Sequence, residues 1–247
     1  LGINCHATIP SRNPEAFLRR FPEFATDPRF AFITGDIRHF IHPQGQFTHV
    51  IHCASDTSRS MLEAPFAHMD TLVNGSRRVL EFAQQAGVRK CLFTSSGVVY
   101  APPSAGCLHL EETAPIALDP SLPHAAYGIG KVAAEHLCHQ TGRRGTMQIT
   151  IARCFSFLGP FMPMRIEHAM GNFLADAVEE DAITVQGDGS PVRSYMYVAD
   201  LAIWLWHMLV NGGNGTVYNV GSDQAITLKE LAHHIAQVVS PGKRVVI

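Results

Sequence analysis

The sequence predicts an α/β fold in which a doubly wound parallel sheet is followed by a small C-terminal lobe. Short apolar runs alternate with longer segments of helical periodicity. The runs are apolar throughout instead of alternating with polar residues, which is typical of parallel strands covered by helices on both faces. Beyond Phe155 the loops lengthen and become rich in glycine and asparagine, so a second unit is expected there.

The apolar runs and periodic segments place the elements of the sheet in order. Four runs are predicted to be strands: residues 29–36, 48–54, 90–95 and 148–153. Helical periodicity predicts one helix over residues 71–86, which Gly87 ends, and another over residues 127–140. Ligands are expected at the carboxyl ends of these strands, as in other doubly wound sheets.

Two capping signals define helices in the C-terminal part. Asp200 is expected to be the N-cap of an apolar helix over residues 200–209. Thr227 and Glu230 have the spacing of a capping box, which predicts the start of a last helix.

Composition excludes several classes of protein. With 247 residues, of which 46% are hydrophobic and 16% charged, the chain is not disordered. A net charge of -2 without long runs of like charge argues against a nucleic-acid-binding face. No apolar run reaches the roughly 20 residues that a membrane span needs, and residues 1–10 lack the pattern of a signal peptide. A cytoplasmic protein without a membrane partner is therefore expected.

Cysteine and histidine usage indicates neither disulfides nor a metal site. None of the six cysteines forms a CxxC pair. Cys53, Cys91 and Cys154 lie within apolar runs, so they are expected to be buried, reduced thiols. The 14 histidines show no spacing typical of metal ligands, and no metal is expected.

A tyrosine–lysine pair follows a strand that ends in serines. Tyr127 and Lys131 are four residues apart in a predicted helix, so they share one face. Tyrosine titrates near 10, so a base working near pH 7 needs its pKa lowered by about 3 units, or roughly 4 kcal/mol. A neighbouring ammonium can contribute to this shift. Residues 94–100 follow the carboxyl end of the preceding strand, and a serine hydroxyl there could bind the substrate oxygen where charge develops.

On these motifs the sequence resembles the extended short-chain dehydrogenase/reductases, the NAD-dependent epimerase/dehydratase family acting on nucleotide sugars. The resemblance extends over nearly the whole chain. The matching segments, in order, are residues 35–37, 52–55, 73–76, Ser96 to Tyr100, Tyr127 with Lys131, 153–160, 187–189, Arg193, 197–200 and 218–221.

The resemblance implies a domain organisation and a set of site residues. Residues 1–155 would form a Rossmann-like NAD(P)-binding domain, and residues 156–247 mainly a substrate-binding lobe with segments returning to the sheet. Ser96, Tyr127 and Lys131 would be catalytic. NAD or NADP would be held by Arg12, Asp36, Ile37, Cys53, Ala54, Ser55, Asn74, Thr94, Tyr127 and Lys131. The nucleotide-sugar substrate would be bound by Ser96, Ser156 and Arg193, with Arg193 on the diphosphate.

One family motif has no counterpart. The sequence contains neither GxxGxxG nor GxGxxG, and Gly128 with Gly130 belongs to the Tyr–Lys motif. Residues 1–14 look like a second strand and its exit loop, so we expect a first strand, its Gly-rich turn and a helix to precede them in a longer functional protein. Arg12, just past this strand, could accept the 2′-phosphate of NADP, which leaves the choice of NAD or NADP open.

Further departures bear on the reaction. Gly97 and Val98 stand where 4,6-dehydratases carry an Asp–Glu pair. This favours an epimerase or a ketosugar reductase over a 4,6-dehydratase, and a nucleotide-sugar epimerase acting through a keto-sugar intermediate is the function expected. A dehydratase or an NADP-linked ketosugar reductase stays open as an alternative, and so does a non-catalytic sensor of a dinucleotide or nucleotide sugar.

The resemblance also implies a homodimer that pairs through two helices. Apolar residues beyond those that face the sheet could form its interface. They are Met69, Leu72, Val132, Ala133 and Leu137.

Overall fold

The structure is a computed structural model that describes residues 4–55, 64–101, 107, 109–122, 124–162, 164–165 and 168–247. The chain divides into two compact units that alternate along the sequence. The first comprises Leu1–Phe93, Asp119–Ile151 and Gly213–Thr216, and the second Thr94–Leu118, Ala152–Gly212 and Val217–Ile247. The division into domains at residues 155 and 156 stays a prediction.

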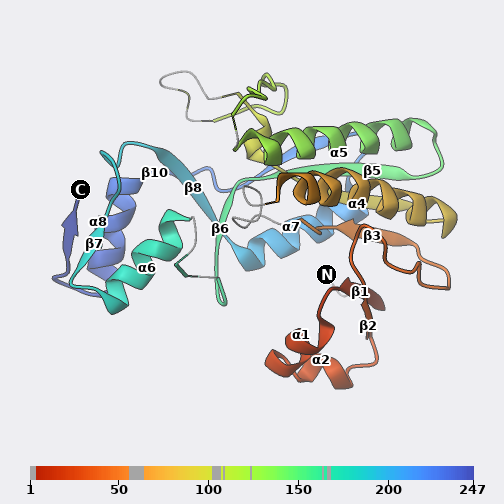
Figure 1. Cartoon of the computed structure of the whole chain (residues 1–247), viewed down its shortest axis with the longest axis horizontal. Helices are drawn as coiled ribbons and strands as arrows, with labels where there is room; N and C mark the ends of the chain where they lie inside the picture. The colour runs from red at the N-terminus through yellow and green to blue at the C-terminus, as the bar shows by residue number, and fades with distance from the viewer. Residues whose placement is uncertain are drawn as a thin grey trace. The chain divides into compact units, whose positions relative to one another are not determined.

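The first unit begins with two parallel strands and two short helices (Figure 1). Strand β1 (Ala7–Ser11) pairs with β2 (Phe30–Thr34), and Ser11 lies opposite Thr34. Between them are α1 (Pro14–Arg20) and α2 (Glu23–Thr26). The Asn13 side chain accepts a hydrogen bond from the Ala16 backbone N–H and so caps α1.

A second sheet has the strand order β3-β4-β5-β9. Its strands are β3 (His49–His52), β4 (Lys90–Ser96), β5 (Gln148–Cys154) and β9 (Val217–Val220). Strands β3 and β4 are parallel. Leu92, Phe93, Ile149 and Ile151 are fully buried, as apolar runs covered on both faces require. The predicted α/β fold with parallel strands is confirmed.

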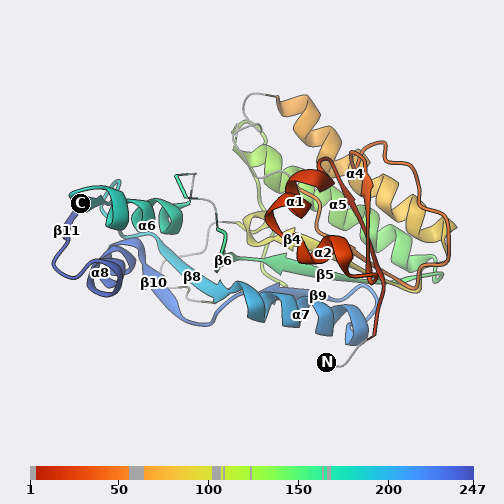
Figure 2. The same ribbon diagram turned by 90° about the horizontal axis from the view of Figure 1, so that it is seen from below.

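Two long helices of the first unit lie side by side (Figures 1 and 2). They are α4 (Pro65–Gln85) and α5 (Ala125–Arg143). Gly130 permits their close approach, because a Cβ there would lie 2.5 Å from Leu72 Cδ1. Helix α4 begins at Pro65, before the predicted start at Thr71, so Asn74 lies inside the helix.

The second unit contains two further sheets. Three strands follow the order β10-β8-β6: β6 (Ser156–Leu158), β8 (Val192–Tyr197) and β10 (Ala225–Thr227). Strand β6 is parallel to β8, and β10 is antiparallel to it. The other sheet pairs β7 (Ala182–Thr184) with β11 (Arg244–Val246) in parallel.

Helices α6 (Ala169–Glu179) and α8 (Leu228–Val239) lie side by side over a shared apolar core (Figures 1 and 2). The predicted capping box at the start of α8 is confirmed, because Thr227 and Glu230 exchange both bonds. Helix α7 (Val198–Asn211) has Tyr197 as its N-cap, so the expectation for Asp200 is wrong. Asp200 instead lies in the first turn, where a negative charge complements the helix dipole.

Candidate functional site

The first two strands end side by side at one sheet edge. The Gly35 backbone N–H donates to the Ser11 carbonyl oxygen at 2.9 Å, directly after the paired ends of β1 and β2. Arg12 and Asp36 each follow one of these strands, so both predicted cofactor residues stand at the same edge. Arg12 is exposed.

The carboxylate of Asp36 is held by an arginine that the sequence analysis did not single out. Arg38 donates to it from Nε and Nη2, both at 2.8 Å, and from its backbone N–H at 2.9 Å. The guanidinium keeps the pKa of Asp36 well below its usual range. Arg38 Nη1 also lies 3.8 Å from Asp70 Oδ2 on α4, and Asp70 accepts a hydrogen bond from Asn74 Nδ2. A polar chain thus connects Asp36 to Asn74.

Ile37, between Asp36 and Arg38, packs on α4. A Cβ at Gly75 would lie 2.8 Å from Ile37 Cγ2, so glycine is needed for this contact. The turn after β2 is therefore fixed to α4 by an apolar contact as well as by the polar chain.

The residues after β3 leave a polar atom unsatisfied. Cys53 is exposed because β3 ends at His52, so the expectation that this thiol is buried is wrong. Ala54 is exposed too. Ser55 Oγ is buried and has no hydrogen-bond partner among the described residues. A buried hydroxyl without a partner is costly, so a polar group of a bound ligand at this strand end would be stabilised. This hydroxyl fits the expected dinucleotide.

His52 is a buried, neutral imidazole. Its Nε2 lies 2.8 Å from Ser76 Oγ, and Ser76 Oγ donates to the Leu72 carbonyl oxygen at 2.6 Å. Because the serine proton is used in that bond, Nε2–H of His52 must be the donor to Ser76. Burial, and then the charge of Lys131, lowers the pKa of His52 to about 3. The ring therefore fixes β3 to α4 in its uncharged form.

Replacing His52 by Gln should flatten the acid side of the stability–pH curve. The folded protein disfavours protonation of His52, whereas the unfolded chain binds the proton near pH 6.5. The contribution of neutral His52 to the free energy of unfolding is complete above about pH 6.5. Between there and pH 3 it falls by up to about 1.4 kcal/mol per pH unit. Urea denaturation at a series of pH values measures this slope. If the free energy of unfolding had the same pH dependence in His52→Gln and wild type, His52 would not be a buried neutral imidazole.

The structure brings Tyr127 and Lys131 together on α5. Lys131 is only 2% exposed, and its Nζ lies 5.6 Å from the centroid of the Tyr127 ring. The same Nζ lies 5.0 Å from the ring of Phe93 on β4. The ring of His68, a buried residue of α4, is 6.1 Å from the Tyr127 ring. An ammonium shielded from water by aromatic rings can act strongly on a neighbouring phenol.

Three residues around this pair were missed by the sequence analysis: Phe93, His68 and Glu135. Glu135 is one helical turn beyond Lys131, is buried, and could have been found from the same spacing of four. His68 comes from another helix, so no local pattern places it near Tyr127.

Ser96 ends β4 in the second unit. Its Oγ accepts a hydrogen bond from the Val98 backbone N–H at 3.3 Å and caps the 3-10 helix η1 (Gly97–Val99). Thr94, two residues earlier, is on the same face of the strand. A Cβ at Gly97 would lie 2.8 Å from Phe155 Cε1, so an acidic side chain at this position would have to displace the ring.

A hydrogen-bond network joins side chains from three of the segments that resemble family motifs. Tyr100 Oη donates to Asn219 Oδ1 at 2.6 Å, and Asn219 Nδ2 donates to the Leu110 carbonyl oxygen at 2.7 Å. Arg153 lies over the Tyr100 ring, 4.7 Å from its centroid, and donates to the Glu112 carbonyl oxygen at 3.1 Å. The network therefore holds residues 110–112 against the strands that carry Arg153 and Asn219.

Two predicted substrate residues share a face of the β10-β8-β6 sheet. Ser156 on β6 lies opposite Tyr195 on β8, and Arg193 is two residues before Tyr195. Since side chains alternate along a strand, Ser156, Tyr195 and Arg193 are on one side. Arg193 is exposed, and its Nη1 donates to the Val192 carbonyl oxygen at 2.8 Å.

The residues that the structure describes contain neither a cluster of metal ligands nor a helix that could span a membrane. No group of three or more His, Cys, Asp or Glu side chains there is placed to hold a metal ion. Within the same residues, every helix is too short or too polar to cross a membrane.

Comparison with known proteins gives consistent relatives. The model of the NAD dependent epimerase/dehydratase family matches residues 11–221. UDP-glucuronic acid decarboxylase 1 of Xenopus tropicalis is 29% identical over 194 residues, which cover 78% of this chain and 45% of the relative. UDP-glucuronic acid decarboxylase 5 of Arabidopsis thaliana is 31% identical over 179 residues, which cover 72% of this chain and 51% of the relative. The chain thus spans about half the length of these curated relatives.

A solved structure shares the fold. The UDP-glucose 4-epimerase of Thermus thermophilus, in complex with NAD, has a TM-score of 0.73 and 25% identity. The match covers 89% of this chain and 72% of that protein.

Proposed function

Since the chain belongs to the NAD dependent epimerase/dehydratase family, we propose that it is part of an NAD(P)-dependent nucleotide-sugar epimerase. The observation that carries this proposal is the Tyr127–Lys131 pair on α5, with Lys131 almost completely buried. A sensor that only bound a nucleotide would not need a buried ammonium beside a tyrosine. The pair therefore favours an enzyme over a binding protein.

The cofactor would be held by residues at the strand ends. The turn with Asp36 and Ile37, the segment 53–55 with its unsatisfied Ser55 hydroxyl, and Thr94 fit this role. Asn74 and Arg12 complete the proposed set. When bound, NAD(P) supplies the acceptor for a hydride and returns that hydride.

The proposed roles of the chain's own side chains are those of acid–base catalysis. Tyr127 Oη takes the proton of a sugar hydroxyl as that carbon is oxidised, and gives it back when the keto sugar is reduced on its other face. Lys131 favours the phenolate form of Tyr127 and would help to hold the cofactor through its ribose. Ser96 Oγ donates a hydrogen bond to the sugar oxygen as it becomes a ketone.

Decarboxylation of a nucleotide-linked uronic acid is the second candidate. Both curated relatives described above are UDP-glucuronic acid decarboxylases. Oxidising the hydroxyl at C4 of a uronic acid gives a β-keto acid, which can lose CO₂ without an added acid–base pair. The tight contact of Gly97 with Phe155 disfavours the alternative of a 4,6-dehydratase, which needs carboxyl groups at residues 97 and 98.

Product analysis with the full-length protein tests the proposal. UDP-glucose, UDP-galactose and UDP-glucuronate would each be incubated with catalytic NAD⁺ and followed by proton NMR. Interconversion of the hexoses without net reduction of NAD⁺ supports the epimerase. Release of CO₂ from UDP-glucuronate would instead indicate a decarboxylase. In a separate incubation with a ketosugar, net consumption of NADPH would indicate a reductase. Binding without turnover of any substrate would indicate a sensor.

Arg193→Ala should raise the KM for the nucleotide sugar about ten- to hundredfold and change kcat little. An arginine on a remote diphosphate contributes to ground state and transition state alike, and a charged hydrogen bond is worth about 1.5–3 kcal/mol. Steady-state kinetics and competition by free UDP measure the effect. Arg244→Ala, on the exposed edge of β11, removes the same charge as a control. Unchanged inhibition by UDP in Arg193→Ala would rule out a diphosphate contact.

We also propose a homodimer that pairs through α4 and α5. One predicted interface residue is unsuitable, because Leu72 is buried against Gly130 inside the α4–α5 contact. Val132, Ala133, Leu137 and Met69 keep part of their surface exposed. Phe66 in the first turn of α4 is 91% exposed and adds apolar surface.

Charges on α5 should separate the dimer. Val132→Lys combined with Leu137→Lys is expected to give a monomer mass in light scattering on the full-length protein, because an unpaired charge is costly in an apolar interface. Val238→Lys on α8, at a residue that is 65% exposed, serves as the control and should leave the mass unchanged. A wild-type monomer would refute the pairing.

A further inference from the structure

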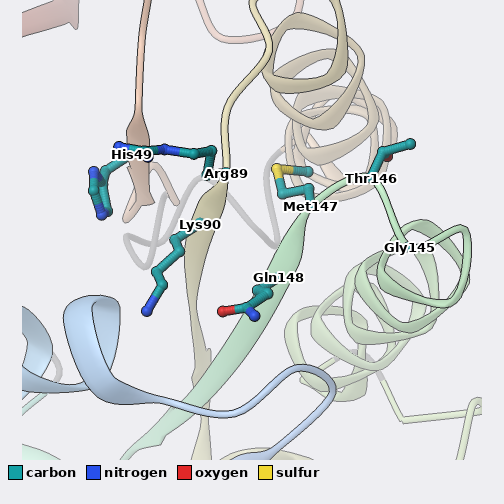
Figure 3. A pocket seen from close by; sticks show the side chains of 7 residues that line it. All are labelled: His49, Arg89, Lys90, Gly145, Thr146, Met147 and Gln148. Carbon is teal, nitrogen blue, oxygen red and sulfur yellow. The ribbon is translucent and has the colours of Figure 1, made fainter.

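A cavity of about 470 Å³ opens at the amino-terminal ends of three neighbouring strands of the first unit (Figure 3). Its lining residues are His49, Arg89, Lys90, Gly145, Thr146, Met147 and Gln148. Strand β4 runs from Lys90 to Ser96. The two ends of a strand of this length are about 20 Å apart, so the cavity is separate from the candidate catalytic residues.

Main-chain hydrogen bonds fix the strand starts that form the cavity. The backbone N–H groups of Arg89 and Lys90 both donate to the Thr48 carbonyl oxygen, at 3.0 and 3.3 Å. The Gln148 N–H donates to the Arg89 carbonyl oxygen at 2.9 Å. Gly145 has a φ of 75°, which glycine adopts without strain, at the turn from α5 into β5. The polar side chains therefore start from a rigid frame.

The cavity is lined by cations and hydrogen-bond donors, and none of its seven lining residues is acidic. Figure 3 shows the Arg89 side chain extending toward His49, while Lys90 and Gln148 come from the neighbouring strands β4 and β5. The pKa of His49 is lowered by burial and by the charges of Arg89 and Lys90. Arg89 and Lys90 thus create a positive potential that disfavours protonation of His49. The same potential attracts an anion.

Size and neighbouring charge indicate the class of ligand. Pockets for small molecules have volumes of roughly 300–1,000 Å³, so this cavity has room for more than an inorganic anion. Arginine binds phosphate oxygens in a bidentate manner, and lysine adds a point charge. Arg143 and Arg144 are both exposed and directly precede Gly145, which adds positive charge beside the cavity.

We propose that this cavity binds a small phosphate-bearing metabolite, with Arg89 and Lys90 on the phosphate and Thr146 and Gln148 on its organic part. The site is independent of the proposed nucleotide-sugar chemistry, because none of its residues belongs to the catalytic or cofactor set.

Calorimetric titration of the full-length protein tests this site. Ribose 5-phosphate is the probe, with inorganic phosphate and ribose as comparisons at constant ionic strength, and with NAD⁺ and UDP present in excess to occupy the other sites. Arg89→Gln combined with Lys90→Gln should weaken binding of ribose 5-phosphate at least about tenfold, since charged hydrogen bonds are lost. Arg19→Gln combined with Arg77→Gln removes two exposed charges elsewhere in the same unit and should change binding less than about twofold.

A second measurement does not depend on the variants. The imidazole protons of His49 in the wild-type protein should shift on adding ribose 5-phosphate, and the pKa of His49 should rise, because a bound anion offsets Arg89 and Lys90. Equal weakening by both double variants would overturn the proposal, since a general effect of charge would then explain the binding. Binding of inorganic phosphate as tight as that of ribose 5-phosphate would also overturn it, because the rest of the cavity would contribute nothing. The proposal would likewise be overturned if ribose 5-phosphate changed neither the imidazole proton shifts nor the pKa of His49.

Discussion

Tyr127→Phe should lower kcat by about 10²- to 10⁴-fold while the KM for the nucleotide sugar stays within a few-fold of wild type. The change removes one hydroxyl and keeps the ring that lies near His68 and Lys131, so binding and packing are preserved. A proton acceptor is required in the transition state far more than in the ground state, which places the loss in kcat. Steady-state kinetics with the substrate identified by product analysis measure both constants.

Tyr100→Phe is the matched control. The Tyr100 hydroxyl donates to Asn219, so its removal should lower the free energy of unfolding by about 1 kcal/mol. The main effect of this variant is therefore expected in Tm. If Tyr127→Phe kept a wild-type kcat, the assignment of Tyr127 as the base would be wrong. An equal loss of kcat in Tyr100→Phe would indicate a general effect of removing a phenol.

The fold was predictable where most of a segment is buried. Strands β4 and β5 match the predicted residues within one position, because their apolar runs are bounded by polar residues at both ends. The start of α4 was missed by six residues. Its first turn carries little apolar periodicity, and the signal lies in Pro65 at the helix start. Aspartate is favoured both at the N-cap and in the first turn of a helix, so the sequence alone does not separate these two positions for Asp200.

The site was predictable where it depends on local spacing. Tyr127 and Lys131 meet because four residues make about one helical turn. The partners of other site residues come from distant parts of the chain, as with His52 and Ser76, 24 residues apart, or Tyr100 and Asn219, 119 residues apart. Such pairs are set by packing of different elements, which one sequence does not reveal. The ion pair between Arg38 and Asp36 is local, and the Asp-x-Arg spacing in the sequence could have indicated it.

Lys131→Met should lower kcat at neutral pH by about ten- to thousandfold, because an opposite charge nearby shifts a pKa by about 1–3 units. The variant keeps an unbranched chain of similar length at a position that is 2% exposed, so the fold should be retained. Without the ammonium, the phenol of Tyr127 should ionise only at higher pH. The pH–kcat profile should therefore shift to the alkaline side, and the deficit should shrink as the pH rises.

Two further measurements test which roles the Lys131 ammonium has. Cofactor affinity, measured by fluorescence titration, should weaken in Lys131→Met if the ammonium also binds the ribose. The pKa of His52, which Lys131 helps to lower to about 3, should rise in the variant when followed by NMR. Lys131→Met with a lower Tm, an unshifted pH profile and unchanged cofactor affinity would show that the ammonium only supports packing. A shifted profile with unchanged affinity would confine its role to Tyr127, since one buried charge can act on the phenol without contacting the ribose.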